Sequence, residues 1–285
     1  MAVYKVLITV TTYPLPSRSY DELVCTAGVL EDGTWIRIFP IPLSFLFDLK
    51  NSGKVNNVKY TWIELELNKR TDDFRPESHS PKYYDFRDMV IHEPRLTTDA
   101  NWFKRKEYCL KNVYTDLAEL IDASKAPANV SLATFKPTKV TGFEWEEDDR
   151  EWKDEWVELR KQTDLFSDGK VDPQKMIPKI PYKFYYRFND ITGKRSRMMI
   201  EDWEIGQLFR NCLKTARKDG APNEKEAETI ALKKVKEKYF DDFVTTKDLY
   251  FFLGTTKKWH SMRSPNPFVI IGIFYPMKET QGSLF

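Results

Sequence analysis

The sequence predicts an α+β protein with mainly antiparallel β-sheets, in barrel-like or sandwich pieces, and several amphipathic helices. Short runs rich in aromatic and β-branched residues, such as Leu249–Leu253 and Phe268–Tyr275, are typical of strands. The second run is almost unbroken apolar, so we expect it in the middle of a sheet with both faces covered. Other segments place apolar residues at the i, i+3, i+4, i+7 spacing of amphipathic helices. With 285 residues, the chain can bury a sizeable core.

The composition excludes several classes of protein. Apolar residues make up 41% and charged residues 31%, which is typical of a globular chain. The longest apolar run falls far short of the roughly 20 residues that a membrane span needs, and no signal peptide is indicated. Three isolated cysteines, Cys25, Cys109 and Cys212, indicate neither a disulfide framework nor a zinc cluster. We therefore expect a cytoplasmic protein with no membrane partner, no metal site and no cofactor.

The first part of the chain is predicted to be rich in strands. Lys5–Val10 is the first strand, and Leu23–Leu30 with Thr34–Pro40 forms a hairpin around Gly33, where the turn favours a left-handed residue. Lys59–Leu67 alternates apolar and polar residues, as a half-buried strand does.

Arg37 is the first candidate binding residue. In the second arm of the hairpin, Ile36 and Ile38 share one face, and Arg37 lies with Trp35 and Phe39 on the other. An arginine flanked by aromatic residues can stack on a base or clamp a phosphate. The alternative is that both aromatic residues belong to the core and Arg37 pairs with an acid.

An acidic segment follows in the middle of the chain. Glu144–Glu158 holds nine acidic and two basic residues, and Trp145, Trp152, Trp156 and Leu159 fall near one face of a predicted helix. This spacing favours a core face. The alternatives are a segment that shields a basic surface, or one that docks a protein partner.

We expect three parts along the chain. Residues 1–143 form a β-rich N-terminal domain with one amphipathic helix, Trp102–Ala123. Residues 144–178 are the acidic segment and a linker with turn signals. Residues 179–285 form an α+β C-terminal domain, in which Glu201 and Asp202 open one helix and Asn223 caps another.

The beginning of this last part carries a basic strand pair. Lys183, Tyr185 and Arg187 share one face of a predicted strand, and Arg195 and Arg197 share a face of the return strand. A sheet face that mixes cations with an exposed tyrosine is typical of single-stranded nucleic-acid binders, in which cations hold phosphates and the aromatic ring stacks on a base. The alternative is a solvated face kept soluble by its charges.

A cationic loop joins the two strands near the end of the chain. It carries Lys257, Lys258, Trp259, His260 and Arg263, and a rigid scaffold that presents such a loop is a common way to build a binding site. The charges of Lys258 and Arg263 are expected to lower the pKa of His260. We interpret this histidine as a phosphate contact; the alternatives are a loop histidine with no role and a catalytic base.

No motif identifies a catalytic residue. The chain has no phosphate-binding loop, no GxGxxG, no HExxH and no nucleophile elbow. The enzyme alternative is a nuclease that would use Mg²⁺ held by carboxylates. Its candidate ligands are Glu64, Glu66, Asp72, Asp73 and Glu77.

Several strings along the chain together resemble an uncharacterised prokaryotic protein family. They are DGTWIRIFPIP (32–42), FRPESH (74–79), SLATFKP (131–137), KFYYRF with IEDWE (183–204), and FFLGT with NPFVIIGIFYP (251–276). They extend over most of the chain. The resemblance implies a setting in phage defence or on a mobile element, and it carries no activity or catalytic residue.

From these residues we predict a protein that binds nucleic acid, DNA or RNA. The predicted surface joins Arg37 and the basic strand pair to the cationic loop, so that phosphates lie on arginine and lysine and a base lies on Tyr185. A metal-dependent nuclease and a protein-interaction module that uses residues 144–158 are the alternatives.

Overall fold

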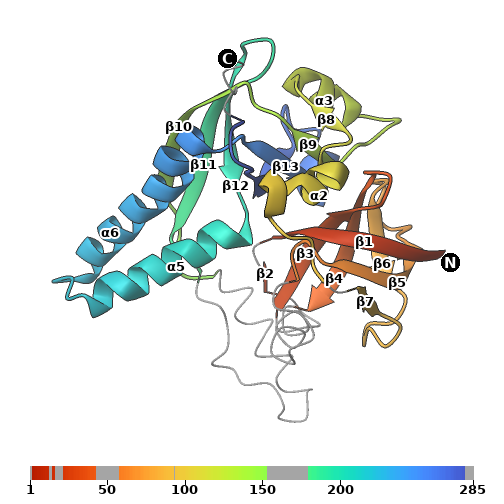
Figure 1. Cartoon of the computed structure of the whole chain (residues 1–285), viewed down its shortest axis with the longest axis horizontal. Helices are drawn as coiled ribbons and strands as arrows, with labels where there is room; N and C mark the ends of the chain where they lie inside the picture. The colour runs from red at the N-terminus through yellow and green to blue at the C-terminus, as the bar shows by residue number, and fades with distance from the viewer. Residues whose placement is uncertain are drawn as a thin grey trace.

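A computed structural model describes residues 2–12, 15–16, 22–42, 58–92, 94–152 and 179–279 (Figure 1). Within these ranges the chain forms a closed β-barrel, a second β-sheet and a layer of helices on that sheet. The α+β class with mainly antiparallel sheets is thereby confirmed. Among the helices of these ranges, none combines the length and the apolar character needed to cross a membrane.

The first half of the chain forms the barrel. Its strands pair in the order β1-β3-β4-β6-β5, and β5 pairs again with β1, which closes the sheet. The pair β4–β6 is parallel, and the other four are antiparallel. This is the strand order of a five-stranded OB barrel. The strands are β1 (Ala2–Thr11), β3 (Glu22–Val29), β4 (Trp35–Pro42), β5 (Trp62–Lys69) and β6 (Ser78–Pro81), with the short strands β2 (Leu15–Pro16) and β7 (Val90–His92) alongside.

Alternating side chains fill the barrel, as the sequence predicts. Ile36 and Ile38 of β4 lie in one cluster with Ile63 and Leu65 of β5. Trp35, on the opposite face of β4, is buried in a different cluster, outside the barrel. The hairpin is also confirmed, because β3 and β4 pair on either side of a turn in which Gly33 adopts a φ of +86°.

The second half of the chain forms an open sheet in the order β10-β11-β12-β14-β13-β9-β8. β12 with β14 and β8 with β9 are parallel pairs, and the others are antiparallel. The long apolar run is central and buried, as predicted. The strands are β8 (Val113–Tyr114), β9 (Leu132–Phe135), β10 (Lys139–Glu147), β11 (Tyr182–Asn189), β12 (Arg195–Ile200), β13 (Tyr250–Thr255) and β14 (Phe268–Phe274).

Helices cover one face of this sheet, and the barrel packs on part of the other. Phe184 and Tyr186 of β11 lie in one cluster with Phe209 and Val235 of the helices. Figure 1 shows α5 and α6 to the left of β10–β12, and the barrel to the right. The helices are α2 (Asp99–Cys109), α3 (Leu117–Ala123), α5 (Trp203–Lys218), α6 (Glu224–Lys236), the π-helix η2 (Glu237–Asp242), α7 (Phe243–Thr246) and α8 (Lys257–Ser261).

Buried polar groups join the barrel to the sheet. Arg37 of β4 donates from Nη1 to Oγ of Ser131 at 2.9 Å. Glu77, which precedes β6, accepts from the Ser131 backbone N–H and hydroxyl. Arg75 donates to the Thr255 carbonyl at 2.7 Å. A buried network of this kind is stable only in one geometry, so it holds the two walls of the site described below at a set distance.

Two helix predictions are wrong. In place of one helix over 102–123 the chain has α2, the short strand β8 and α3, because β8 pairs with β9 and Asp116 caps a new helix by accepting from the N–H of Ala118 at 2.8 Å. The acidic segment is not helical where it is described: residues 144–147 continue β10 and pair with β11. Trp145 is 39% exposed and so belongs to no core face. Residues 153–178, with Trp156, Leu159 and the linker, lie outside the described ranges.

The two later helices begin where the sequence predicts. Asp202 is the N-cap of α5 and accepts from the N–H of Glu204 at 3.1 Å. Asn223 is the N-cap of α6 and accepts from the N–H of Glu226 at 2.9 Å. The first of these caps lies at the edge of the site.

Candidate functional site

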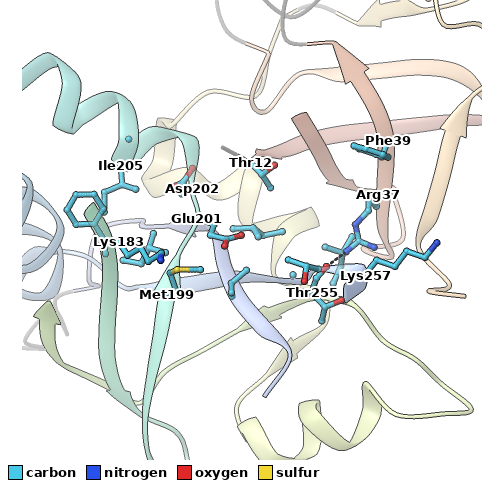
Figure 2. A pocket seen from close by; sticks show the side chains of 18 of the residues that line it. Thr12, Arg37, Phe39, Lys183, Met199, Glu201, Asp202, Ile205, Thr255 and Lys257 are labelled. Carbon is cyan, nitrogen blue, oxygen red and sulfur yellow. Dashed lines mark hydrogen bonds between the residues drawn. The ribbon is translucent and has the colours of Figure 1, made fainter. Parts of the chain in front are cut away.

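A cleft of about 490 Å³ lies between the barrel and the second sheet. One wall comes from β4 and the β5–β6 loop, and the other from β11, β12 and the start of α5 (Figure 2). We call it the cleft throughout. Its lining includes Arg37, Phe39, Arg70, Asp73, Arg75, Asp148, Trp152, Lys179, Lys183, Phe184, Met199, Glu201, Asp202, Ile205, Thr255, Lys257, Val269 and Ile271.

The barrel wall is cationic. Arg37 and Arg75 are buried and held by hydrogen bonds, the first to Ser131 and the second to Asp73 at 2.6 Å. Arg70 is only partly buried; it pairs with exposed Asp72 at 2.5 Å, and its guanidinium lies 5.3 Å from the Phe39 ring. Each of these arginines is thus fixed by its neighbours rather than free to rotate.

Lys257 extends this cationic wall from the second sheet. It opens α8, its side chain is about half exposed, and its Nζ donates to the carbonyl oxygen of Asp72. Figure 2 shows Lys257 on the same side of the cleft as Arg37 and Phe39. A loop of the barrel and a helix that follows β13 therefore contribute to one positively charged surface.

The sheet wall is acidic and apolar. Lys183 and Lys179 reach the same carboxylate, Asp148, at 2.8 and 3.0 Å, and Glu201 and Asp202 add two further carboxyl groups to this wall. Met199 of β12 and Ile205 of α5 provide apolar surface. The cleft is therefore polarised, with excess positive charge on the barrel wall and none on the sheet wall.

Glu201 lies between these two walls. Figure 2 shows its carboxyl group between Asp202 and Met199 on one side and Arg37 and Thr255 on the other. Its backbone N–H donates to the Ile270 carbonyl at 2.7 Å. Within the described ranges its carboxyl group has no hydrogen-bond or ion-pair partner, and burial raises its pKa.

Asp202 is buried beside Glu201. One of its oxygens caps α5, and the other, Oδ2, has no partner in the part of the chain that the structure describes. Burial raises the pKa of Asp202 to about 7, despite the nearby Lys59 ammonium, which is held by Glu204 at 2.8 Å. Two adjacent carboxyl groups whose pKa values are both raised by burial are typical of functional sites.

The cleft unites some of the predicted binding residues and leaves others outside. Arg37, Lys183 and Lys257 line it. The strand-pair residues Tyr185, Arg187, Arg195 and Arg197 lie on the sheet face that continues from Lys183, where register pairs Arg187 with Arg197. Lys258 and Arg263 are exposed and are not part of the lining.

The exposed sheet face is largely neutralised by the acidic segment. Glu144 accepts from Arg187 and from Arg197 Nε at 3.0 Å, and Glu146 accepts from Arg197 Nη2 at 2.5 Å. Arg197 also stacks on the Tyr185 ring at 3.5 Å. These contacts match the alternative in which the acidic segment shields a basic surface.

His260 does not lie on the surface. It is buried in α8, its Nδ1 lies 2.9 Å from Oγ1 of Thr255, and its Nε2 lies 2.6 Å from the Ser124 carbonyl. Its pKa is lowered, as predicted, but for a different reason: burial is the main cause, and Arg75 and Arg37 contribute. His260 therefore positions Thr255, and a direct phosphate contact would require it to leave these partners.

The candidate ligands of the nuclease alternative have separate partners. Asp73 pairs with Arg75, Asp72 with Arg70, and Glu66 with Lys82. Glu64 lies 3.3 Å from His92, and Glu77 is bound to Ser131. Within the described ranges, no three His, Cys, Asp or Glu side chains are grouped so that they could hold a metal ion.

Sequence reasoning missed Glu201 and the two loop arginines. The string IEDWE was interpreted as a helix start, in which acids are common, and Arg70 and Arg75 belong to a polar loop. A signal existed for Glu201: it follows the buried end of a strand, Ile200, so its side chain points to the face opposite the helices. Only the packing of the barrel against that face shows that it borders a cleft.

Two protein-family models together match almost the whole chain. A family model described as "Domain of unknown function (DUF8757)" matches residues 114–285, and one described as "Domain of unknown function (DUF8758)" matches residues 2–111. No curated protein matches. Among solved structures, a murine DNA-binding protein bound to double-stranded DNA aligns with 98% of this chain and 97% of its own, at 10% identity and a TM-score of 0.30. A score this low supports no conclusion about fold or function.

Proposed function

We propose that this chain, which belongs to the DUF8757 family, binds nucleic acid through the cleft between its barrel and its second sheet. The observation that carries the proposal is the cationic barrel wall. Arg70 and Lys257 are partly exposed at the cleft, and the Arg70 guanidinium lies 5.3 Å from the Phe39 ring. Proteins that bind single-stranded nucleic acids combine cations with aromatic rings, because the cations contact phosphates and the rings stack on bases.

The barrel topology supports the same surface. OB barrels bind oligonucleotides on the face of their second and third strands and in the loop between the fourth and fifth. Here those elements are β3, β4 and the β5–β6 loop, and they supply Arg37, Phe39, Arg70 and Arg75 to the cleft. This is an analogy of fold, so it supports the proposal without carrying it.

The sheet face next to the cleft provides a path for further nucleotides. Lys183 lies at the cleft, and Tyr185, Arg187 and Arg197 continue from it along β11 and β12. In our proposal, phosphates compete with Glu144 and Glu146 for these arginines. The acidic segment then lowers the affinity for any polyanion and favours ligands that also fill the cleft.

Binding to labelled oligonucleotides tests the proposal. The full chain is titrated with single- and double-stranded DNA and RNA over a salt series, once with Mg²⁺ and once with EDTA. We expect single strands to bind without cleavage and log K to fall linearly with log salt, by about 0.7 per phosphate contact. Failure to bind under every condition would overturn the proposal, and cleavage that requires Mg²⁺ would replace it with the nuclease.

The setting of this function is a separate proposal. The resemblance noted above associates such chains with phage defence and mobile elements. If that setting is correct, bacteria that express the chain resist phage, and bacteria that express a variant defective in oligonucleotide binding do not. A plaque assay compares the two strains, and equal plaque numbers would contradict it.

A further inference from the structure

The unpartnered Glu201 carboxyl group defines what the centre of the cleft can recognise. An ionised carboxyl group offers two adjacent acceptor oxygens and no donor. Leaving such a group without partners in a partly buried site costs free energy, which a ligand with matching donors recovers. The matching partner therefore presents two N–H donors side by side.

Among the four common bases, guanine has this arrangement on its Watson–Crick edge, in N1–H and the N2 amino group. Cytosine and adenine each present one donor beside an acceptor, and uracil presents one donor between two acceptors. A carboxylate thus pairs with guanine at two points and with the other bases at one. Recognition of this kind is worth about 1–3 kcal/mol against a wrong base, or roughly five- to 150-fold in affinity.

The surroundings of Glu201 suit a flat, partly apolar ring with a phosphate at some distance. Met199, Ile205 and Ile271 line the cleft near the sheet wall, and Arg70 and Lys257 line it at the barrel wall. Figure 2 shows Glu201 between Met199 and Ile205 on one side and Lys257 on the other. The volume of about 490 Å³ is within the range of roughly 300–1,000 Å³ typical of small-ligand sites.

We infer that the cleft holds one guanine nucleotide, with the base edge on Glu201, the ring between the apolar side chains, and the phosphate on Arg70 and Lys257. The inference deepens the proposed function and rests on the same cleft. The nucleotide comes either from a single strand, as a base turned out of its stack, or from solution as a free nucleotide. Its chemistry is the same in both cases.

Calorimetric titration of the full chain with GMP, AMP, CMP and UMP is the first test. We expect GMP to bind most tightly and Glu201→Gln to reduce its advantage over AMP by about tenfold or more. The matched control is Glu119→Gln, which alters an exposed glutamate of α3 and leaves the preference unchanged. Thermal unfolding of each variant confirms that the fold is retained. Equal binding of the four nucleotides, or a preference that survives Glu201→Gln, would overturn the inference.

A second titration separates the two sources of the nucleotide and the two proposals. Oligo-dT is compared with oligo-dT that carries one central dG. Tighter binding of the dG strand, lost in Glu201→Gln, assigns the nucleotide to a strand. Equal binding of both strands, together with equal binding of the four nucleotides, upholds nucleic-acid binding and overturns the guanine site. Binding of GMP with no binding of either strand upholds the guanine site for free nucleotide and overturns nucleic-acid binding.

Discussion

Glu77 and Ser131 are joined by two hydrogen bonds across the boundary between the barrel and the second sheet. Oε1 of Glu77 accepts from the Ser131 backbone N–H at 2.9 Å, and Oε2 accepts from the Ser131 hydroxyl at 2.7 Å. Both residues are buried, and buried Arg37 donates to the same hydroxyl. The relationship matters for function because β4 belongs to one wall of the cleft, and Ser131 precedes β9 in the sheet whose strands β11 and β12 carry the other wall.

Glu77→Ala is expected to lower the free energy of unfolding by about 2–4 kcal/mol, because it leaves the Ser131 N–H and hydroxyl buried without their acceptor. Urea unfolding measures the loss. Glu119→Ala, at an exposed position of α3, is the control and is expected to change stability by at most about 0.5 kcal/mol. If both variants unfold at the same urea concentration, the junction does not hold the walls together.

Asp202→Asn is expected to stabilise the chain at alkaline pH. The folded-state pKa of Asp202 is raised from 3.8 to about 7, so the folded chain binds more protons than the unfolded chain, and stability falls as pH rises through this window. Asparagine keeps the cap on α5 and removes the buried charge. The gain is at most about 4 kcal/mol at pH 8 and vanishes near pH 4.

Urea unfolding at pH 4, 6 and 8 checks this dependence. Asp219→Asn, at an exposed position after the other end of α5, is the control and is expected to show the pH dependence of the unmodified chain. A constant difference between Asp202→Asn and the unmodified chain at all three values would contradict the shift.

Lys257→Ala is expected to weaken oligonucleotide binding severalfold and to reduce the slope of log K against log salt by about 0.7–0.9, because one phosphate contact is lost. Lys258→Ala is the matched control. Lys258 follows Lys257 in the chain, carries the same charge and is also exposed, but it lies outside the cleft lining. Fluorescence anisotropy over a salt series measures both slopes. Equal losses in the two variants would assign binding to the outer surface of α8 instead of the cleft.

Replacing Glu144 and Glu146 together by glutamine is expected to raise the affinity for single strands severalfold and to steepen the salt dependence. Both acids hold arginines of the sheet face, and Arg197 would then be available to phosphate. The control for net charge is Glu147→Gln combined with Glu151→Gln, which also removes two negative charges at exposed positions of the acidic segment. Unchanged affinity in the double variant would mean that this face takes no part in binding.

Local patterns were sufficient for much of the fold. The strand Tyr182–Asn189 and its return strand were predicted from alternation alone, because burial of one face repeats every second residue. Asp202 and Asn223 were predicted as helix starts, because capping depends on a few neighbouring residues. The helix predicted over 102–123 failed because its centre pairs with β9, which lies later in the chain.

The candidate site was harder to predict for the same physical reason. Lys183 and Lys257 were recognised as charged residues on exposed elements, which a sequence can indicate. That they line one cleft with Arg70 depends on how the β5–β6 loop, β11 and α8 pack together. Likewise, the charge pattern could not tell that Glu144 would neutralise Arg187, because this pairing requires the register of β10 on β11.

By itself, the sequence determined the class of fold, most of its strands, the starts of its two longest helices and the excess of basic residues on β11 and β12. These follow from local periodicity and local hydrogen bonding. Only the tertiary structure decided that the barrel closes, that its arginine-bearing wall faces the second sheet, and that Glu201 is left without a partner between them. Barrel closure and burial depend on contacts between residues far apart in the chain, and no short segment encodes the surface that it will meet.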